Sequence, residues 1–235
     1  MKLNVVLAEA ALELVPDDLL KKPAVSSDAE RRGVEASRML LDQSVHHSAM
    51  LKLEEHYKRG RPDLVHIALM SLVSTPLYLD GDLKVFIHAW NDTLLEIKEG
   101  TRLPKSYLRF RGVMEKVLTG GGGEGLIKVQ NGTLDELVGI IRPDWVCALS
   151  IQGVSTELNE LSGSLLSRKN PCVIIGGFPH GHFSQSTLHL VDSLVRIDSR
   201  PLEAHVVAAR LVYEVERRLR RDNLESERHA RPRPL

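Results

Sequence analysis

A run of four apolar residues that ends in two glycines constrains the fold of this chain more than any other segment. Residues 172–175 (Cys-Val-Ile-Ile) follow one another without polar alternation, which is the pattern of a strand covered on both faces in a parallel α/β sheet. Gly176 and Gly177 then permit positive φ and the close approach of a ligand, whereas Pro179 restricts the turn and Gly181 frees it again. Because ligands bind at the carboxyl ends of such strands, the segment predicts either a small-molecule site or a tight exit turn without a ligand.

Strand and helix signals alternate along the rest of the chain, which predicts an α/β fold with a mainly parallel sheet and helices on both faces. Thr133 and Glu136 have the spacing of a capping box, and Pro201 suits the first turn of a long last helix. We expect strands at residues 3–8, 84–89, 94–97, 126–129, 145–151, 172–175 and 190–197. We expect helices at residues 10–14, 46–57, 64–73, 107–118, 133–141, 155–166 and 201–221. Residues 22–27 are expected to form a loop, 120–123 a flexible glycine run, and 222–235 a disordered polar tail.

The composition excludes several classes of protein. With 235 residues, of which 43% are hydrophobic, the chain can form one large α/β domain. No apolar run approaches the roughly 20 residues of a membrane helix, and Glu9 interrupts the apolar start before a signal peptide could form. We therefore expect a cytoplasmic protein without a membrane partner. Lysine plus arginine equals aspartate plus glutamate, 31 each, so any surface that binds nucleic acid must be local.

The cysteines and histidines predict no metal site and no disulfide. Cys147 and Cys172 both lie within apolar runs and are expected to be buried structural thiols. The histidines have no cluster of Cys, Asp or Glu at ligand spacing, so we expect ordinary surface or core side chains. The histidines considered are His46, His47, His66, His180 and His182.

A basic segment at residues 101–111 contains four cations and no acid. Its first three cations lie three and four residues apart, so a helical or turn-like path would bring them to one face. Guanidinium groups match phosphate oxygens, and Tyr107 and Phe110 could stack on a base or pack inward. The absence of acids favours an anionic partner over a solvated helix face, without separating RNA from a nucleotide. The cations are Arg102, Lys105, Arg109 and Arg111.

Residues 60–63 (Gly-Arg-Pro-Asp) place an arginine and an aspartate two positions apart around a proline. One interpretation is a helix that stops and restarts, with Asp63 as N-cap or first-turn acid and Arg61 as its ion-pair partner. In the other, Arg61 binds a phosphate or orients Asp63 toward a substrate. The turn taken alone favours the structural interpretation.

Three segments together resemble the ribosome-biogenesis pseudouridine-N1 methyltransferases of small-subunit rRNA, a branch of the SPOUT superfamily. They are residues 60–66 (Gly-Arg-Pro-Asp-Leu-Val-His), residues 101–118, and residues 175–181 (Ile-Gly-Gly-Phe-Pro-His-Gly). The opening residues 3–16 also resemble the start of that family, and the resemblance extends to about residue 221. The short N-terminus is similar to that of archaeal-type members.

The resemblance implies an α/β knot, in which the C-terminal chain forms a trefoil, an exception to the general absence of knots. It implies one SPOUT methyltransferase domain over residues 1–221, with an inserted extension at about 15–60 and a β-hairpin and basic segment at about 84–111. It also implies a homodimer that binds S-adenosylmethionine in the knotted cleft. The methyl group would go to N1 of a pseudouridine in a 16S-type rRNA hairpin loop, and ribosomal proteins of the small subunit are further candidate partners.

The resemblance also assigns site residues. Three stretches would form the cofactor cleft, with Phe178 and Pro179 shaping its wall: Ser150, Ile151 and Gly153; Gly176, Gly177 and Gly181; and Ile197, Asp198, Ser199, Arg200, Pro201 and Leu202. The RNA side would take Arg61, Arg102, Lys105 and Arg109. Lys105 stands where some relatives have arginine, so it keeps the charge but loses bidentate phosphate geometry.

The acceptor in this reaction is a ring N–H, which becomes nucleophilic only as its proton leaves. We expect Asp63, oriented by Arg61, to take that proton directly or through water. A purely structural role for Asp63 stays open. Two other functions also stay open: a non-catalytic RNA-binding assembly factor of the small ribosomal subunit, and a SPOUT methyltransferase that acts on tRNA.

Overall fold

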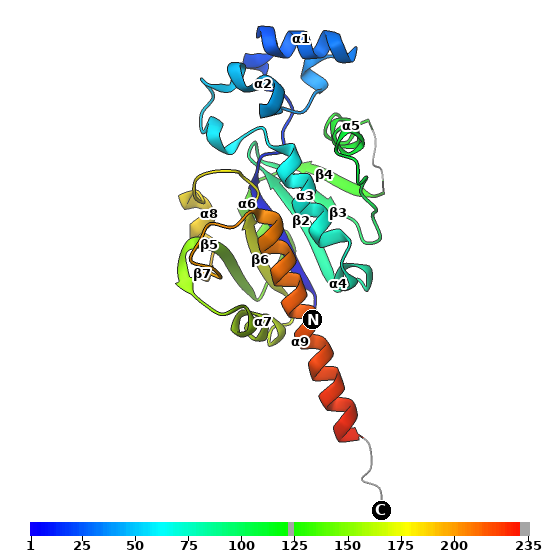
Figure 1. The fold of residues 1–235 in the computed structure, drawn as a ribbon, viewed down its shortest axis with the longest axis vertical. Coiled ribbons are helices and arrows are strands. Elements are labelled where there is room, and N and C mark those ends of the chain that lie inside the picture. Colours follow the sequence, from blue (N-terminus) through cyan, green and yellow to red (C-terminus); the bar gives the residue numbers. More distant parts are fainter. Residues whose placement is uncertain (122–124, 231–235) are drawn as a thin grey trace, which may run out of the picture.

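The computed structural model of the chain describes residues 1–121 and 125–230, and within these ranges a seven-stranded sheet runs through the molecule (Figure 1). The strand order is β4-β3-β2-β1-β6-β5-β7. Strands β2, β1, β6, β5 and β7 run parallel, whereas β3 and β4 are antiparallel additions at one edge. This mainly parallel sheet confirms the predicted α/β class; the knot stays a prediction. The strands are β1 (Leu3–Ala10), β2 (Leu83–Ala89), β3 (Thr93–Ile97), β4 (Ile127–Asn131), β5 (Trp145–Ser155), β6 (Pro171–Gly176) and β7 (Ser193–Arg196).

Strand β1 occupies the centre of the sheet, and all eight of its residues are buried. Alternate side chains enter two different apolar clusters: Leu3 and Val5 on one face, Val6 and Ala8 on the other. A strand covered on both faces needs a largely apolar sequence, and residues 5–8 supply it. The two polar residues of β1, Asn4 and Glu9, are buried and hydrogen-bonded, Asn4 to the Pro171 carbonyl and Glu9 to Lys58. Because β1 pairs in parallel with β6, its carboxyl end lies beside the glycines that follow β6.

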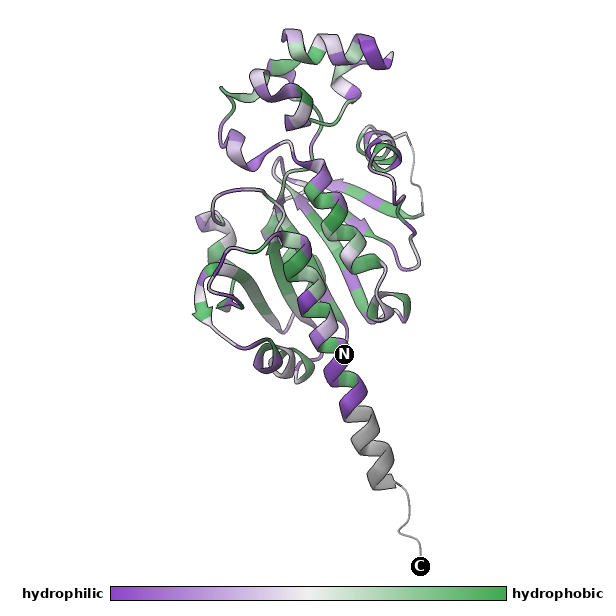
Figure 2. Cartoon of the chain, in the orientation of Figure 1, coloured by the Kyte–Doolittle hydropathy of each residue, from purple (hydrophilic) through white to green (hydrophobic). Residues whose placement is uncertain are grey.

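Helices cover both faces of the sheet. Helices α3, α4, α5, α7 and α9 contribute to the larger apolar cluster, and α6 and α8 contribute to the smaller one. Figure 2 shows hydrophobic residues concentrated in the central strands and on the helix sides that face them. The α-helices are α1 (Pro23–Arg32), α2 (Gln43–Met50), α3 (Pro62–Val73), α4 (Pro76–Leu79), α5 (Tyr107–Leu118), α6 (Leu134–Ile141), α7 (Leu158–Leu166), α8 (Gln185–His189) and α9 (Ala204–Ala230), and the short 3-10 helices are η1 (Asp17–Leu19), η2 (Ala36–Arg38) and η3 (His56–Lys58).

Residues 11–61, called the extension below, connect β1 to α3 and pack around an apolar cluster of their own. Val25, Met39 and Leu41 are fully buried in that cluster. Helices α1 and α2 lie beyond the end of the sheet at which α3 begins (Figure 1). The extension therefore stands at the carboxyl edge of the parallel strands, where a ligand site is expected.

The helix predicted at residues 10–14 is wrong. Strand β1 continues to Ala10, and the Ala11 N–H donates to the Gly177 carbonyl at 2.9 Å. The Arg61 N–H in turn donates to the Ala11 carbonyl at 3.1 Å. These backbone groups bond to distant segments and cannot close a helical turn, so tertiary contacts override a composition rich in Ala, Leu and Glu.

Other boundaries also differ from the predicted ones. Residues 22–27 are not a loop, because α1 begins at Pro23, which suits the first helical position. The helix predicted at 46–57 is too long: α2 starts after its N-cap Asp42 and ends at Met50. The first turn of the last helix lies at Ala204, later than the predicted Pro201. Short helix α8 was not predicted.

The end of the chain also differs from the prediction. Helix α9 continues to Ala230, so the prediction of disorder from residue 222 is wrong for residues 222–230. Residues 231–235 lie outside the described residues, as do residues 122–124, which include part of the predicted glycine run. The capping box of Thr133 and Glu136 and the hairpin of β2 and β3 are confirmed.

Candidate functional site

A cavity of about 410 Å³, called the cleft below, opens at the carboxyl ends of β5, β6 and β7. Its position follows the rule for parallel α/β sheets, and its volume lies within the roughly 300–1,000 Å³ of small-molecule sites. The walls come from the ends of these strands, from residues 178–183 after β6, and from the turn before α9. The lining residues are Leu149, Ser150, Ile151, Ile175, Gly176, Phe178, Pro179, His180, Gly181, His182, Phe183, Val195, Arg196, Ile197, Asp198, Arg200, Pro201, Leu202, Glu203, Ala204 and Val207.

Nine of the twelve residues that the sequence predicted around the cofactor line this cleft, and three do not. Phe178 and Pro179 also lie in the wall, as predicted. The lining nine come from three separate parts of the chain, which the parallel strands bring to one edge of the sheet. They are Ser150, Ile151, Gly176, Gly181, Ile197, Asp198, Arg200, Pro201 and Leu202; the three outside the lining are Gly153, Gly177 and Ser199.

Gly153 and Gly177 support the cleft from behind. A Cβ on Gly153 would lie 2.5 Å from the backbone C and N of Val195, where the register between β5 and β7 shifts. A Cβ on Gly177 would lie 2.7 Å from the Cβ of Ala10, and the Gly177 N–H donates to the Ala8 carbonyl at 2.8 Å. Real side chains essentially never approach so closely, so both positions require glycine for backbone packing.

Several lining residues were missed by the reasoning from sequence. Ile175 stands directly before the predicted Gly176 at the end of β6, and Glu203 stands directly after Leu202. His180 and His182 flank Gly181 and are exposed. Both histidines could have been predicted from their position beside Gly181, a glycine in the loop after a strand. They were instead interpreted as ordinary surface or core histidines, because no metal ligands accompany them.

Asp198 organises the turn between β7 and α9. It accepts hydrogen bonds from the backbone N and the Nε of Arg200, at 3.1 and 3.0 Å, and from Nη1 of Arg210 at 3.2 Å. The hydrogen bonds from Arg200 hold the pKa of Asp198 well below its ordinary value. The ionised carboxylate therefore draws the Arg200 guanidinium back onto the turn at the rim of the cleft.

Arg61 and Asp63 form a bidentate ion pair at the start of α3. Arg61 Nε donates to Asp63 Oδ1 at 2.8 Å, and Nη2 donates to Oδ2 at 2.9 Å. Partial burial raises the pKa of Asp63, but the hydrogen bonds and positive charge of Arg61 together with nearby backbone N–H groups outweigh it, and the net pKa lies below the ordinary value of 3.8. Asp63 is thus ionised at neutral pH. It is the second residue of α3, and the N-cap position belongs to Arg61, so a first-turn acid is the correct structural description.

This ion pair stands at the start of α3, which packs against α9 of the cleft wall and against α5 of the basic segment. The hydrogen bond to Asp63 raises the pKa of Arg61, and the negative charge of Glu203 in the cleft wall adds to the effect. In the basic segment, burial raises the pKa of Tyr107, and the hydrogen bond to Asp42 raises it further. The negative charge of Asp63 also contributes to this rise. The structure therefore brings Arg61 and Asp63 into electrostatic contact with both regions, and helix α3 packs along α9 (Figure 1).

The basic segment presents three of its four cations to solvent and buries two of its apolar residues, whereas Arg111 is half-buried and Leu108 is exposed. Leu103 and Phe110 are buried, and the His66 ring stacks on Phe110 with 4.3 Å between centroids. His66 Nε2 also lies 2.7 Å from the Pro104 carbonyl oxygen. Phe110 therefore packs inward and is not available to a base. Three side chains are exposed and form no hydrogen bond or ion pair with any other described residue: Arg102, Lys105 and Arg109.

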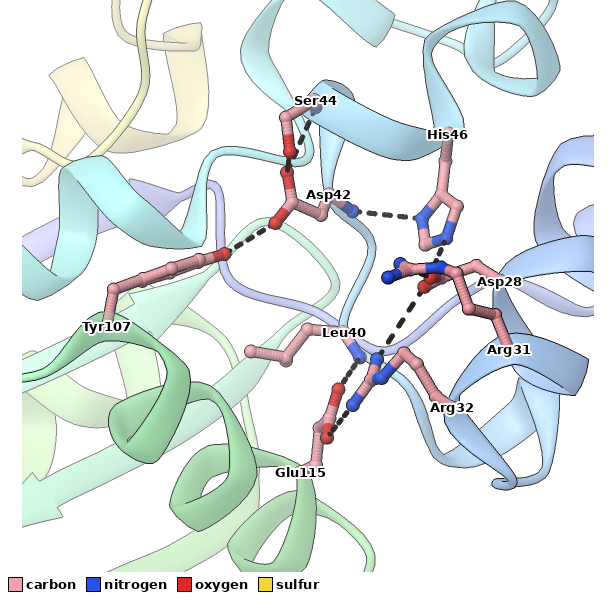
Figure 3. Close-up of polar contacts among 9 residues, drawn as sticks. All are labelled: Asp28, Arg31, Arg32, Leu40, Asp42, Ser44, His46, Tyr107 and Glu115. Carbon is pink, nitrogen blue, oxygen red and sulfur yellow. Dashed lines mark hydrogen bonds and ion pairs between the residues drawn. The ribbon is translucent and has the colours of Figure 1, made fainter.

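The extension holds the helix that follows this segment (Figure 3). Asp42 accepts a hydrogen bond from the Tyr107 hydroxyl at 2.5 Å, at the first residue of α5. Farther along α5, Glu115 accepts from Arg32 Nη2 at 2.6 Å and from the Leu40 backbone N at 3.1 Å. The extension thus fixes α5, the helix that carries Arg109, at both Tyr107 and Glu115.

The chemistry of the cleft suits an organic ligand better than a metal ion. No group of three or more His, Cys, Asp or Glu in the described part of the chain could hold a metal. Both cysteines are buried and free, as predicted, and burial raises the pKa of each thiol to about 12. The wall combines apolar side chains such as Phe178 and Val195 with polar groups such as Ser150 and Glu203, a mixture that fits a nucleoside with charged substituents.

Comparison with known proteins agrees with this geometry. The family model described as EMG1/NEP1 methyltransferase matches residues 5–216. The ribosomal RNA small subunit methyltransferase Nep1 of Thermococcus kodakarensis is 36% identical over 217 residues, covering 91% of this chain and 97% of the relative. The protein of the same description from Saccharolobus solfataricus is 40% identical over 216 residues, covering 90% and 95%.

A solved structure gives the same result in three dimensions. The crystal structure of Archaeoglobus fulgidus Nep1 bound to S-adenosylhomocysteine matches with a TM-score of 0.82 and 35% sequence identity, covering 92% of this chain and 98% of that one. The family resemblance inferred from three short segments is confirmed over most of the chain. The chain therefore belongs to the EMG1/NEP1 methyltransferase family.

Proposed function

We propose that this protein transfers a methyl group from S-adenosylmethionine to N1 of a pseudouridine in a hairpin loop of small-subunit rRNA. The observation that carries the proposal is the cleft at the ends of β5, β6 and β7, which gathers residues from three distant parts of the chain. A family whose relatives are named as small-subunit rRNA methyltransferases, and a structural neighbour bound to S-adenosylhomocysteine, support this use of the cleft.

The cleft residues bind and orient the cofactor. Gly176 and Gly181 lie in the cleft wall as glycines because Phe178 occupies the side-chain space at Gly176, and Tyr57 and Lys58 occupy it at Gly181. Gly181 also has a φ of 97° that favours glycine. Phe178 supplies an apolar surface, and Ser150 a hydroxyl. When bound, S-adenosylmethionine supplies a methyl group activated by its sulfonium, so the protein needs mainly to place the acceptor nitrogen in line with that methyl group.

The exposed cations of the basic segment, called the basic surface below, hold the RNA. Arg102, Lys105 and Arg109 bind backbone phosphates, since their charged groups are exposed and have no partner among the described residues. Arg61 directs the target nucleotide toward the cleft, because it stands at the start of α3, which packs against elements of both regions. A base in a hairpin loop can be turned out of its stack at small cost.

Asp63 receives the N1 proton, directly or through water, as the new N–CH3 bond forms and the bond from methyl carbon to sulfur breaks. The contact with Arg61 keeps Asp63 ionised but makes it a weak base, because it lowers the pKa of the carboxyl. Positioning therefore carries most of the rate, and Asp63 serves to accept the proton at the right place.

Two measurements test the function. Isothermal titration should show binding of S-adenosylhomocysteine, and radioactive methyl transfer should occur to a 16S-type hairpin with pseudouridine but not to the same hairpin with uridine. Hairpin binding without any cofactor binding would favour a non-catalytic assembly factor of the small subunit. Transfer to tRNA in place of the hairpin would favour the tRNA enzyme.

The proposal also includes the oligomeric state, the cellular location and the domain arrangement of the protein. The protein acts as a homodimer in the cytoplasm, on pre-ribosomal particles where small-subunit ribosomal proteins are neighbours. One methyltransferase domain spans residues 1–221, with the C-terminal chain threaded as a trefoil and the extension as an insertion. Residues 1–121 and 125–230 contain no helix that is long and apolar enough to cross a membrane. Sedimentation of the purified chain checks the dimer.

A further inference from the structure

A buried carboxylate joins three distant parts of the chain beneath residues 178–183. These residues line the proposed cofactor cleft and are called the cofactor loop below. Glu9, near the end of β1, accepts a hydrogen bond from Lys58 Nζ on its Oε2 at 3.0 Å. Its other oxygen, Oε1, accepts from the Ser184 backbone N and from the Thr187 hydroxyl, each at 2.8 Å. Ser184 is the N-cap of α8 and follows the cofactor loop directly. The side chains of Lys58 and Glu9 are only 3% and 8% exposed.

Lys58 also contacts the cofactor loop itself. Its Nζ lies 5.2 Å from the centroid of the Phe178 ring, within the range of a cation–π interaction. Its Cε would lie 3.3 Å from a Cβ built on Gly181. Phe178 and Gly181 both line the cleft, whereas Lys58 does not. A residue of the extension is therefore in contact with the cofactor wall without reaching the cofactor's place.

The local backbone adopts an unfavourable conformation to make this arrangement. Glu9 has a φ of 50°, in the left-handed region that favours glycine, at the point where the register between β1 and β2 shifts. The Glu9 N–H there points at His88 Nδ1, 3.4 Å away. Such a conformation persists in a non-glycine residue only where the surroundings fix it, and such positions gather at functional sites.

The charge of Lys58 is retained despite burial. Burial lowers the pKa of Lys58, but the hydrogen bonds to Glu9 and Glu55 and the negative charges of these two residues together outweigh that effect, so the net pKa is raised. Removing the ammonium would leave Glu9 buried without its cation, and an unpaired buried carboxylate is costly. The loop would then lose the fixed acceptor that holds Ser184 and Thr187.

We propose that Lys58 and Glu9 are positioning residues for the cofactor loop, so that the extension sets the affinity of the cleft for S-adenosylmethionine. The proposal rests on the proposed function, because it takes the cleft to be the cofactor site. Lys58 fixes Glu9, Glu9 fixes the start of α8, and Lys58 supports Phe178 and Gly181 from below. The loop is thereby held ready before the cofactor arrives, and less ordering is needed on binding.

Calorimetry with S-adenosylhomocysteine tests the proposal on the full-length protein. The variant Lys58→Met removes the charge and keeps most of the stem, and it should weaken binding by roughly tenfold or more, the effect expected for losing a charged hydrogen-bond partner. Lys58→Arg keeps the charge and should recover a large part of the affinity. Affinity for the rRNA hairpin should stay near that of the wild type.

The neighbouring residue provides a matched control. Arg59 forms an equally buried bidentate ion pair with Glu13, both contacts at 2.7 Å, and does not line the cleft. Arg59→Met should lower the melting temperature about as much as Lys58→Met does, yet leave cofactor affinity near that of the wild type. Equal losses of cofactor affinity in the two variants would overturn the proposal, because a general loss of stability would then explain both.

A milder variant keeps the test decisive if Lys58→Met does not fold. Thr187→Val is nearly isosteric and removes one hydroxyl donor to Glu9. It should weaken S-adenosylhomocysteine by a few fold, and unchanged affinity would count against the proposal. A wild-type protein that binds no S-adenosylhomocysteine would instead overturn the proposed function. Normal wild-type binding with unaffected Lys58→Met and Thr187→Val variants would overturn only the positioning role.

Discussion

The cleft and the basic surface use different kinds of groups. The cleft is formed by strand ends and main chain, and its shape depends on close backbone contacts at Gly153 and Gly177. The basic surface consists of exposed side chains on a segment that buried aromatic residues hold in place. In the proposed function, the first region fixes the position of a small molecule and the second presents charge to a large polyanion.

This difference shows where each region is vulnerable. A steric change behind the cleft alters its shape, while salt has little effect on groups shielded inside it. A change of one exposed cation leaves the fold intact but weakens an interaction that salt also weakens. The Arg61–Asp63 pair is coupled electrostatically to residues of both regions, and in the proposed function it serves the step that needs both ligands.

The largest effect is expected from Asp63→Asn. The rate of methyl transfer should fall by about 10²–10⁴, the usual contribution of a positioned proton acceptor. Cofactor and hairpin affinities should change little, because the amide keeps the size of the side chain and an acceptor oxygen for Arg61. Single-turnover kinetics with saturating ligands measure the rate. Transfer at the wild-type rate would leave Asp63 only its structural role at the start of α3.

The next largest effect is expected from Gly153→Ala, which should alter the cleft and leave the basic surface unchanged. Gly153→Ala would place a Cβ 2.5 Å from the Val195 backbone, so β7 must move. We expect a loss of about 1–3 kcal/mol in the free energy of unfolding, typical of overpacking, together with weaker S-adenosylhomocysteine binding. Denaturant unfolding and calorimetry measure the two effects. RNA affinity should stay near normal.

Gly139 provides the control for this substitution. It is exposed in α6, and a Cβ built on it meets nothing within 4 Å. Gly139→Ala should therefore stabilise the protein by up to about 1 kcal/mol, since alanine favours the helix. Equal behaviour of the two variants would show that the contact with Val195 does not set the shape of the cleft.

The sequence predicted what local pattern and topology determine. Apolar runs at residues 3–8 and 172–175 marked strands buried on both faces, and parallel strands bring their ends to one edge, so most of the cleft followed. The basic segment was recognisable because no acid interrupts it. Its inward-facing aromatic residue could not be assigned, since that depends on His66, which stacks on it from α3.

The sequence could not predict features that depend on distant partners. Residues 10–14 have helical composition, yet their backbone bonds to Gly177 and Arg61. No role was predicted for Lys58, whose side chain turns inward because it pairs with Glu9, 49 positions away in the sequence. No periodicity records such a pairing, and the pairing becomes visible only when the extension folds back over the carboxyl edge of the sheet.

A smaller effect is expected at the basic surface. Arg102→Ala and Arg109→Ala should each weaken hairpin binding by roughly tenfold at low salt and reduce the salt slope by about one phosphate contact. Fluorescence anisotropy at several salt concentrations gives both quantities, and cofactor affinity should not change. Arg217, an exposed arginine of α9 paired with Glu214, is the control, and its alanine variant should bind RNA normally. An unchanged salt slope for Arg102→Ala would remove that residue from the interface.

The smallest effect concerns the pH dependence of the Arg61–Asp63 pair. The folded-state pKa of Asp63 lies below its ordinary value of 3.8, so the pair contributes stability above that pH and loses it as the pH falls through the folded-state pKa. The side chains are 35% and 41% exposed, so solvent limits the contribution to about 1 kcal/mol or less. Wild type should therefore melt at a slightly higher temperature than Asp63→Asn at neutral pH, and this difference should disappear in acid.

The variant Asp135→Asn is the control. It alters a first-turn acid of α6 that has no ion-pair partner among the described residues, and it should differ less from wild type in melting temperature. A gap between wild type and Asp63→Asn that widened in acid would mean that the folded protein does not favour the ionised carboxylate, and the proton-acceptor role would lose its electrostatic basis.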